Sequence, residues 1–198
     1  MDELINSFNL IITQIQKNLA LLGVILLIPW CIFFISACLD KRVLLLGIIP
    51  RHVRGLPGIL CAPLLHANFN HLFFNSIPLF VLSAFILING LYYYIVTTLL
   101  ITILSGLALW CFAKSGLYIG ASALITGYWG LLVTNAYQHT TPTTVTLGAL
   151  SLYYFAGIFM GIFPKDKGVS WQGHLFGLLA GFATSYLLQQ YPFIVLNN

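Results

Sequence analysis

Six long runs of apolar residues, each nearly free of charge, constrain this chain more than any other feature of its sequence. An α-helix needs about 20 apolar residues to cross the hydrocarbon core of a membrane. The runs cover residues 18–39, 70–88, 91–113, 122–137, 145–163 and 173–191, of which 122–137 is short. The sequence therefore predicts an all-α integral membrane protein, a bundle of six transmembrane helices.

The composition supports a membrane protein of one domain, residues 1–198. Hydrophobic residues make up 60% of the chain and charged residues only 6%, whereas a soluble domain carries about a quarter charged residues. The eight Lys and Arg residues form no dense basic stripe, which argues against a nucleic-acid partner. The first apolar run lacks the pattern of a cleaved signal peptide and is interpreted as a retained helix.

The segment between the first two runs differs from the other connections. It has about thirty residues, too many for a tight turn, and it contains the apolar stretches LLLGII and GILCAPLL. Such a composition predicts a loop that lies partly in the membrane interface.

Polar residues recur at the start of alternate runs. We call the N-terminal side of the membrane side A and the opposite side B, so that the second, fourth and sixth helices begin on side B. Their first turns carry His71 and Asn75, then Ser122, then His174, and His66 lies just upstream. By span count and helical rise, these residues are expected at one membrane depth near side B.

Each of these residues alone has a structural explanation. A single His or Asn in a membrane helix can hydrogen-bond a neighbouring helix, and a Ser between Gly and Ala usually allows close packing. Three glycines at four-residue intervals, Gly173, Gly177 and Gly181, predict close approach of the last helix to a neighbour.

Together the polar residues also fit acyl transfer. A Ser hydroxyl becomes a nucleophile when a base, usually His, takes its proton. Ser122 and His174 would meet if the glycines of the last helix pack on the fourth. His71, Asn75 and the Ser122 amide could then donate to an oxyanion. The four acidic residues all lie outside the runs, so the predicted pair is a Ser–His dyad.

The order of three motifs resembles the rhomboid intramembrane serine proteases. These are HANFNHLFFN at 66–75, GAS at 120–122 and GHLFGLLAG at 173–181. The resemblance covers the six-helix core. It implies Ser122 as nucleophile, His174 as general base, and an oxyanion site formed by His71, Asn75 and the Ser122 amide. It also implies that transmembrane protein substrates enter laterally from the bilayer, and that the long first loop packs sideways in the membrane.

Two positions beside the nucleophile depart from the family pattern. The residue after the serine is usually Gly and is Ala123 here, and a frequent aromatic four residues after the serine is replaced by Thr126. Gly120, Ala123, Thr126 and His66 are expected to support the site or line the substrate position. The departures leave a second hypothesis, a weak or inactive rhomboid-like protein that binds client transmembrane helices. A transporter is disfavoured because the polar residues gather at one depth.

The charges and the resemblance predict opposite orientations. Side A has only Lys17, whereas side B has seven basic residues: Lys41, Arg42, Arg51, Arg54, Lys114, Lys165 and Lys167. The positive-inside rule would place side B in the cytoplasm. The resemblance implies a bacterial inner-membrane protein whose site faces the extracytoplasmic side, which is the orientation we expect. The dispersed histidines predict no metal, and no glycine motif predicts a nucleotide cofactor.

Overall fold

The computed structural model describes residues 2–38, 40–163 and 170–191, and these residues form helices joined by turns. Lys165 and Lys167 lie outside the described residues. The eight α-helices of this part are α1 (Asp2–Lys17), α2 (Leu19–Cys38), α3 (Gly58–Cys61), α4 (Phe69–Leu87), α5 (Leu91–Phe112), α6 (Ser122–Gln138), α7 (Pro142–Met160) and α8 (Trp171–Gln190). Each of the six predicted runs corresponds to one long helix, with ends that differ by at most three residues. The prediction of an all-α chain is confirmed for the described residues.

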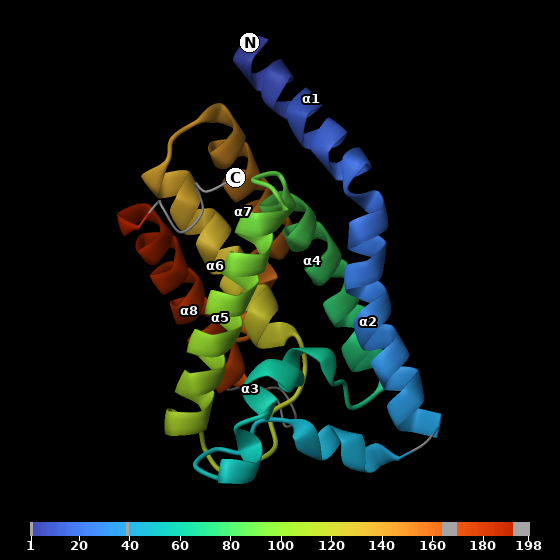
Figure 1. Cartoon of the computed structure of the whole chain (residues 1–198). Coiled ribbons are helices and arrows are strands. Elements are labelled where there is room, and N and C mark those ends of the chain that lie inside the picture. The colour runs from blue at the N-terminus through green and yellow to red at the C-terminus, as the bar shows by residue number, and fades with distance from the viewer. Residues whose placement is uncertain (1, 39, 164–169, 192–198) are drawn as a thin grey trace.

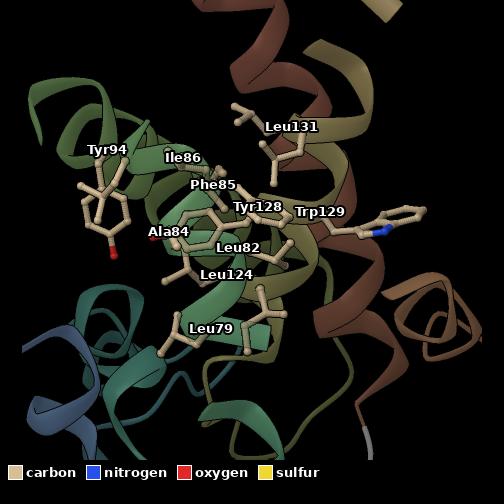
Figure 2. Packing of buried hydrophobic residues seen from close by; sticks show 14 of the residues in the cluster. Leu79, Leu82, Ala84, Phe85, Ile86, Tyr94, Leu124, Tyr128, Trp129 and Leu131 are labelled. Carbon is tan, nitrogen blue, oxygen red and sulfur yellow. The ribbon is translucent and has the colours of Figure 1, made fainter. Parts of the chain in front are cut away.

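Helix α6 occupies the centre of the bundle and contacts α4, α5, α7 and α8 (Figure 1). Nine consecutive residues of α6, numbers 124–132, are buried. Figure 2 shows the ring of Tyr128 lying among Leu82, Phe85 and Leu131, where it fills the space between α4 and α6. Its hydroxyl is paired with Thr98 Oγ1 of α5 at 2.6 Å, because a buried polar group needs a hydrogen-bond partner. The short helix α6 is therefore held by packing on all sides.

Within the part of the chain that the structure describes, three helices, α2, α4 and α5, are long and apolar enough to cross a membrane by length and composition. Helix α2 exposes many of its apolar side chains, among them Val24, Leu27 and Phe34. Exposed apolar surface of this extent fits a lipid environment.

Helix α1 was not among the predicted elements. It runs along nearly the same line as α2 at the edge of the molecule (Figure 1). Its inner face buries Ser7 and Ile11 against α7 and α4, and Thr143 Oγ1 at the start of α7 donates to Ser7 Oγ at 3.2 Å. Apolar residues at helical spacing, Ile5, Phe8 and Ile12 among them, were the signal that could have predicted this amphipathic helix.

The loop between α2 and α4 folds into short helical pieces: the 3₁₀ helices η1 (Lys41–Leu46), η2 (Val53–Gly55) and η3 (Ala62–Leu64), with α3 between η2 and η3. Leu45, Val53 and Leu60 are exposed, which fits the expected position in the membrane interface. Ile48 and Tyr118 exchange two backbone hydrogen bonds of 3.0 and 2.9 Å. The loop is thereby attached to the turn that precedes α6.

Arg51 attaches the same loop to the end of α5. It has a left-handed backbone, φ 61°, which non-glycine residues adopt only when surrounding contacts hold them. Its guanidinium donates to the carbonyl of Ala113 at 2.6 Å, and its backbone N–H donates to the carbonyl of Trp110 at 2.9 Å. A cation is favourable at the carbonyl end of a helix, so Arg51 fixes the loop at side B.

Candidate active site

The turn before α6 brings Ser122 to the first position of that helix. Gly120 in this turn has φ 114°, a conformation that glycine adopts without steric cost. A side chain at Gly120 would also meet the ring of His71, 2.6 Å from the Cβ position. The N–H of Gly120 donates to the carbonyl of Ala62 at 2.9 Å. Glycine is therefore required at position 120, both for the turn and for contact with α4.

Helix α4 contributes the two predicted oxyanion residues. Asn68 caps the helix by accepting a hydrogen bond from the N–H of His71 at 2.9 Å. His71 and Asn75 are one turn apart on the same face of α4, and both lie against Gly120. Segments 66–75 and 120–122 therefore lie side by side at the start of α6.

His66 lies in the loop before α4 and contacts both of these segments. Its Nε2 is 3.2 Å from Asn75 Nδ2 and 3.4 Å from the backbone nitrogen of Ala121. Its ring meets the ring of His71 edge-on, with centroids 5.0 Å apart. Burial, together with the charge of His71, lowers the pKa of His66 from 6.5 to about 4. A neutral imidazole is therefore expected at neutral pH.

Helix α8 packs so closely against α6 that only glycine fits at two of its contact positions. A Cβ at Gly177 would collide with the Ala123 carbonyl, and a Cβ at Gly181 would collide with the Gly127 carbonyl. Gly173, the third glycine of the predicted stripe, differs: a Cβ there would approach only Ser170. Ser170 caps α8 by accepting from the N–H of Gly173 at 3.1 Å. Small residues thus allow close approach along α8 from Gly177 onward.

The close approach places His174 near the other polar residues. His174 lies one turn before Gly177, is partly buried, and interacts electrostatically with His71. Among the described residues, Nδ1 of His174 has no hydrogen-bond partner. Residues from α4, α6 and α8 therefore gather at one end of the bundle.

The structure shows what surrounds the two positions that depart from the family pattern, Ala123 and Thr126. Ala123 lines a cavity with its neighbour Ser122. Thr126 is fully buried, and its hydroxyl donates to the carbonyl of Ser122 at 2.5 Å, inside α6. Tyr128 bonds to α5, and the Trp129 indole donates to the carbonyl of Ser151 on α7.

A cavity of about 30 Å³ adjoins Ser122 on the side of α5. One water molecule needs about 10–15 Å³ of such space, so the cavity has room for about two. Its lining residues come from the loop (Ile48, Ile59, Ala62, Pro63), from α5 (Thr102, Ser105, Gly106, Leu109), from the turn and first residues of α6 (Tyr118, Ile119, Gly120, Ser122, Ala123, Leu124) and from the start of α8 (Ser170, Gly173). The α5 residues were not predicted from the sequence. The sequence signal that could have indicated them is a pair of hydroxyl side chains three positions apart within an apolar run, Thr102 and Ser105.

A family model for the Rhomboid domain matches residues 54–191. The chain belongs to the rhomboid family. The resemblance seen in the sequence motifs is thereby confirmed, and a rhomboid is a membrane protein, as the apolar helices indicate.

Relatives of this rhomboid occur in mycobacteria. Uncharacterized proteins of Mycobacterium tuberculosis and Mycobacterium bovis are each 39% identical over 151 residues, which cover 72% of this chain and 63% of theirs. An uncharacterized protein of Mycobacterium leprae is 36% identical over 146 residues, 66% of this chain and 55% of its own. The chain thus spans less than two thirds of the length of these relatives.

Proposed function

We propose that this rhomboid is an intramembrane serine endopeptidase that uses Ser122 as nucleophile and His174 as general base. The observation that carries the proposal is the packing around Ser122. The turn that bears it lies against His71 and Asn75 of α4, while α8 brings His174 to the same end of α6 through the glycine contacts. A serine, a histidine and oxyanion donors on three separate helices are what acyl transfer requires.

The first half of the reaction forms an acyl-enzyme. Ser122 Oγ attacks the scissile carbonyl carbon as its proton passes to His174, and the carbonyl oxygen becomes an oxyanion. The backbone N–H of Ser122, at the start of α6, can donate to this negatively charged oxygen. The side chains of Asn75 and His71 supply further donors. The carbon–nitrogen bond then breaks, His174 protonates the leaving amine, and an ester to Ser122 remains.

Water completes the reaction. A water molecule gives a proton to His174 and attacks the ester carbonyl, and the carbon–oxygen bond to Ser122 breaks as the proton returns to Oγ. The products are a new carboxyl terminus and a free enzyme. The cavity beside Ser122, with the hydroxyls of Thr102 and Ser105, supports a local supply of this water.

The proposed substrate is a transmembrane segment that enters from the bilayer. Helices α4 and α7 make few contacts with each other, and both carry exposed apolar residues, Phe74 and Tyr153 among them. We therefore propose six membrane crossings, by α2 and α4 to α8, with substrate entry between α4 and α7. By the resemblance to rhomboid proteases, we expect the cut in a helix-destabilised segment, next to a small residue.

A chemical probe and a substrate test the assignment together. Wild-type protein is incubated with a fluorophosphonate probe and with a transmembrane reporter, and Ser122→Ala and His174→Ala are compared. Both variants are expected to lose labelling and cleavage. Ser151→Ala, which removes another buried serine hydroxyl, serves as the matched control and should behave as wild type.

The alternative is a rhomboid-like protein that binds client helices without cutting them. Ala123 favours it, because its methyl lines the cavity beside Ser122. In that case the wild-type protein would capture the reporter without cleaving it, and Ser122→Ala would change nothing. Labelling that persists in Ser122→Ala would contradict the nucleophile assignment.

Localisation is part of the proposal. We propose a bacterial inner membrane and a site on the extracytoplasmic side. A tag placed in the loop at residues 41–54 should be reached by a membrane-impermeant reagent added outside intact cells. Cytoplasmic labelling of this loop would reverse the orientation and agree with the count of basic residues.

A further inference from the structure

The hydrogen bonds of His66 fix its tautomer. Asn75 Nδ2 and the Ala121 backbone nitrogen both carry protons, and both lie within 3.4 Å of Nε2 of His66. The Ala121 backbone nitrogen can only donate, so Nε2 must offer it a lone pair, and the ring proton then resides on Nδ1. His66 is 2% exposed, and its Nδ1 has no hydrogen-bond partner among the described residues. His66 is therefore a neutral acceptor held inside the protein.

The acceptor decides which end of the Asn75 amide faces the site. The oxygen and nitrogen of an asparagine amide are nearly equal in size, so packing alone selects poorly between the two orientations. An oxyanion needs a donor, so the NH₂ end must point to it. Nδ2 has two protons: one goes to His66, and the other is left for the side of Gly120, whose Cβ position is 3.6 Å from Nδ2.

The same lone pair also holds the turn that carries the nucleophile. Ala121, whose N–H points to Nε2 of His66, directly precedes Ser122. One imidazole thus connects the oxyanion side chain of α4 to the start of α6. Neither of these contacts involves the substrate position.

We propose that His66 is a positioning residue of the reaction: as a neutral acceptor it holds the Asn75 amide with its NH₂ end toward the oxyanion and fixes the turn before Ser122. This inference rests on the proposed protease function and deepens it. His66 acts through Asn75 and Ala121 and touches no reacting atom.

Two substitutions separate the acceptor from the volume of the ring. His66→Leu removes the acceptor, and His66→Gln keeps an acceptor oxygen. We expect His66→Leu to lower kcat by up to about 10²–10³-fold, the loss typical of one oxyanion donor, with KM nearly unchanged. His66→Gln should restore much of kcat. His52→Gln, an exposed histidine of the same loop, is the matched control and should have wild-type rates.

A double-mutant cycle tests the route through Asn75. If His66 acts by orienting that amide, His66→Leu should cost far less in an Asn75→Ala background than in the wild type. Equal costs in both backgrounds would overturn the proposal. So would a His66→Leu variant that loses thermal stability while its kcat stays at the wild-type value.

Ring nitrogen NMR of the wild-type protein tests the tautomer directly, even where His66→Leu does not fold. The His66 signals are assigned by their absence in His66→Gln, and a protonated Nδ1 with a bare Nε2 is expected. A protonated Nε2 would overturn the proposal. A wild-type protein that neither reacts with fluorophosphonate nor cleaves the reporter would instead refute the protease function, and the positioning role with it. Wild-type activity combined with an unaffected His66→Leu would refute the positioning role alone.

Discussion

Gly120 and Ala123 lie on either side of Ser122, the proposed nucleophile, and the structure assigns them different constraints. Gly120 cannot carry a side chain, because its backbone is left-handed and the His71 ring occupies the Cβ position. Ala123 has its methyl beside the cavity, while its carbonyl lies against Gly177. The sequence predicted both as neighbours of the site. It could not distinguish a required glycine from a tolerated methyl, because that depends on which helix each residue faces.

Ala123→Gly is expected to increase activity. Removing the methyl enlarges the space beside Ser122, whereas glycine in a helix costs up to about 1 kcal/mol. Fluorophosphonate labelling should therefore be faster and the Tm slightly lower. Labelling slower than wild type would show that the methyl positions the first turn of α6 and does not obstruct the site.

The lowered pKa of His66 predicts that the folded protein loses stability as the pH falls. Its pKa is about 4 in the folded protein because burial, and then the charge of His71, disfavour the cation. The unfolded chain has a pKa of about 6.5 and binds the proton first as the pH falls. Stability is thus full above about pH 6.5 and declines toward pH 4, by about 3 kcal/mol for this group.

Thermal unfolding measured from pH 7 to pH 4 checks this, with His66→Gln for comparison. The wild type should lose more Tm than the variant over this window. Parallel curves would mean that other groups, such as His71 at the edge of the ring, account for the acid loss.

At the scale of elements, the contact of α6 with α8 brings together the two helices that carry the proposed dyad. Carbonyls of α6 occupy the Cβ positions of Gly177 and Gly181. The four-residue spacing predicted a close neighbour, and the alternation of helices placed Ser122 and His174 at one depth. The sequence did not show that Gly173 lies outside this contact. Nor did it show the attachment of the loop to α5 through Arg51, because a contact between Arg51 and the Ala113 carbonyl has no local pattern.

Gly177→Ala is expected to abolish cleavage. The added methyl would overlap the Ala123 carbonyl and push α8 away from α6, and with it His174 from Ser122. Gly157→Ala on α7 is the matched control, because a Cβ at Gly157 meets nothing within 4 Å. Both variants are assayed with the transmembrane reporter and by Tm. Wild-type cleavage by Gly177→Ala would mean that the dyad does not depend on this contact.

Across the whole molecule, α1 links the two helices that border the proposed substrate entry. It packs on both α4 and α7 at side A, while α4 and α7 barely touch each other. Length, apolar runs and helix order predicted the bundle, but a sixteen-residue helix before the first run has too few residues to cross a membrane. The contacts of α1 with α4 and α7 give it the linking role described above.

A disulfide between α1 and α7 tests this role. Ser7 Oγ and Thr143 Oγ1 are 3.2 Å apart, so Ser7→Cys combined with Thr143→Cys should oxidise readily. We expect the oxidised protein to cleave the transmembrane reporter more slowly while fluorophosphonate labelling of Ser122 is unchanged, with recovery on reduction. Equal slowing of both reactions would point to distortion of the site, and no effect on either would mean that α7 does not move.

Under the proposed function, the cavity beside Ser122 would give the reaction two separate supply routes, one for the peptide and one for water. Among the described residues, those that line it belong to α5, the first loop and the starts of α6 and α8, and none belongs to α4 or α7. The peptide would arrive from lipid on one flank and the water from the opposite flank. Hydrolysis of the ester would then not have to wait for the cleaved helix to diffuse away. Lipid composition would govern how often the enzyme is acylated, and the hydroxyls of α5 would govern how long each acylation lasts.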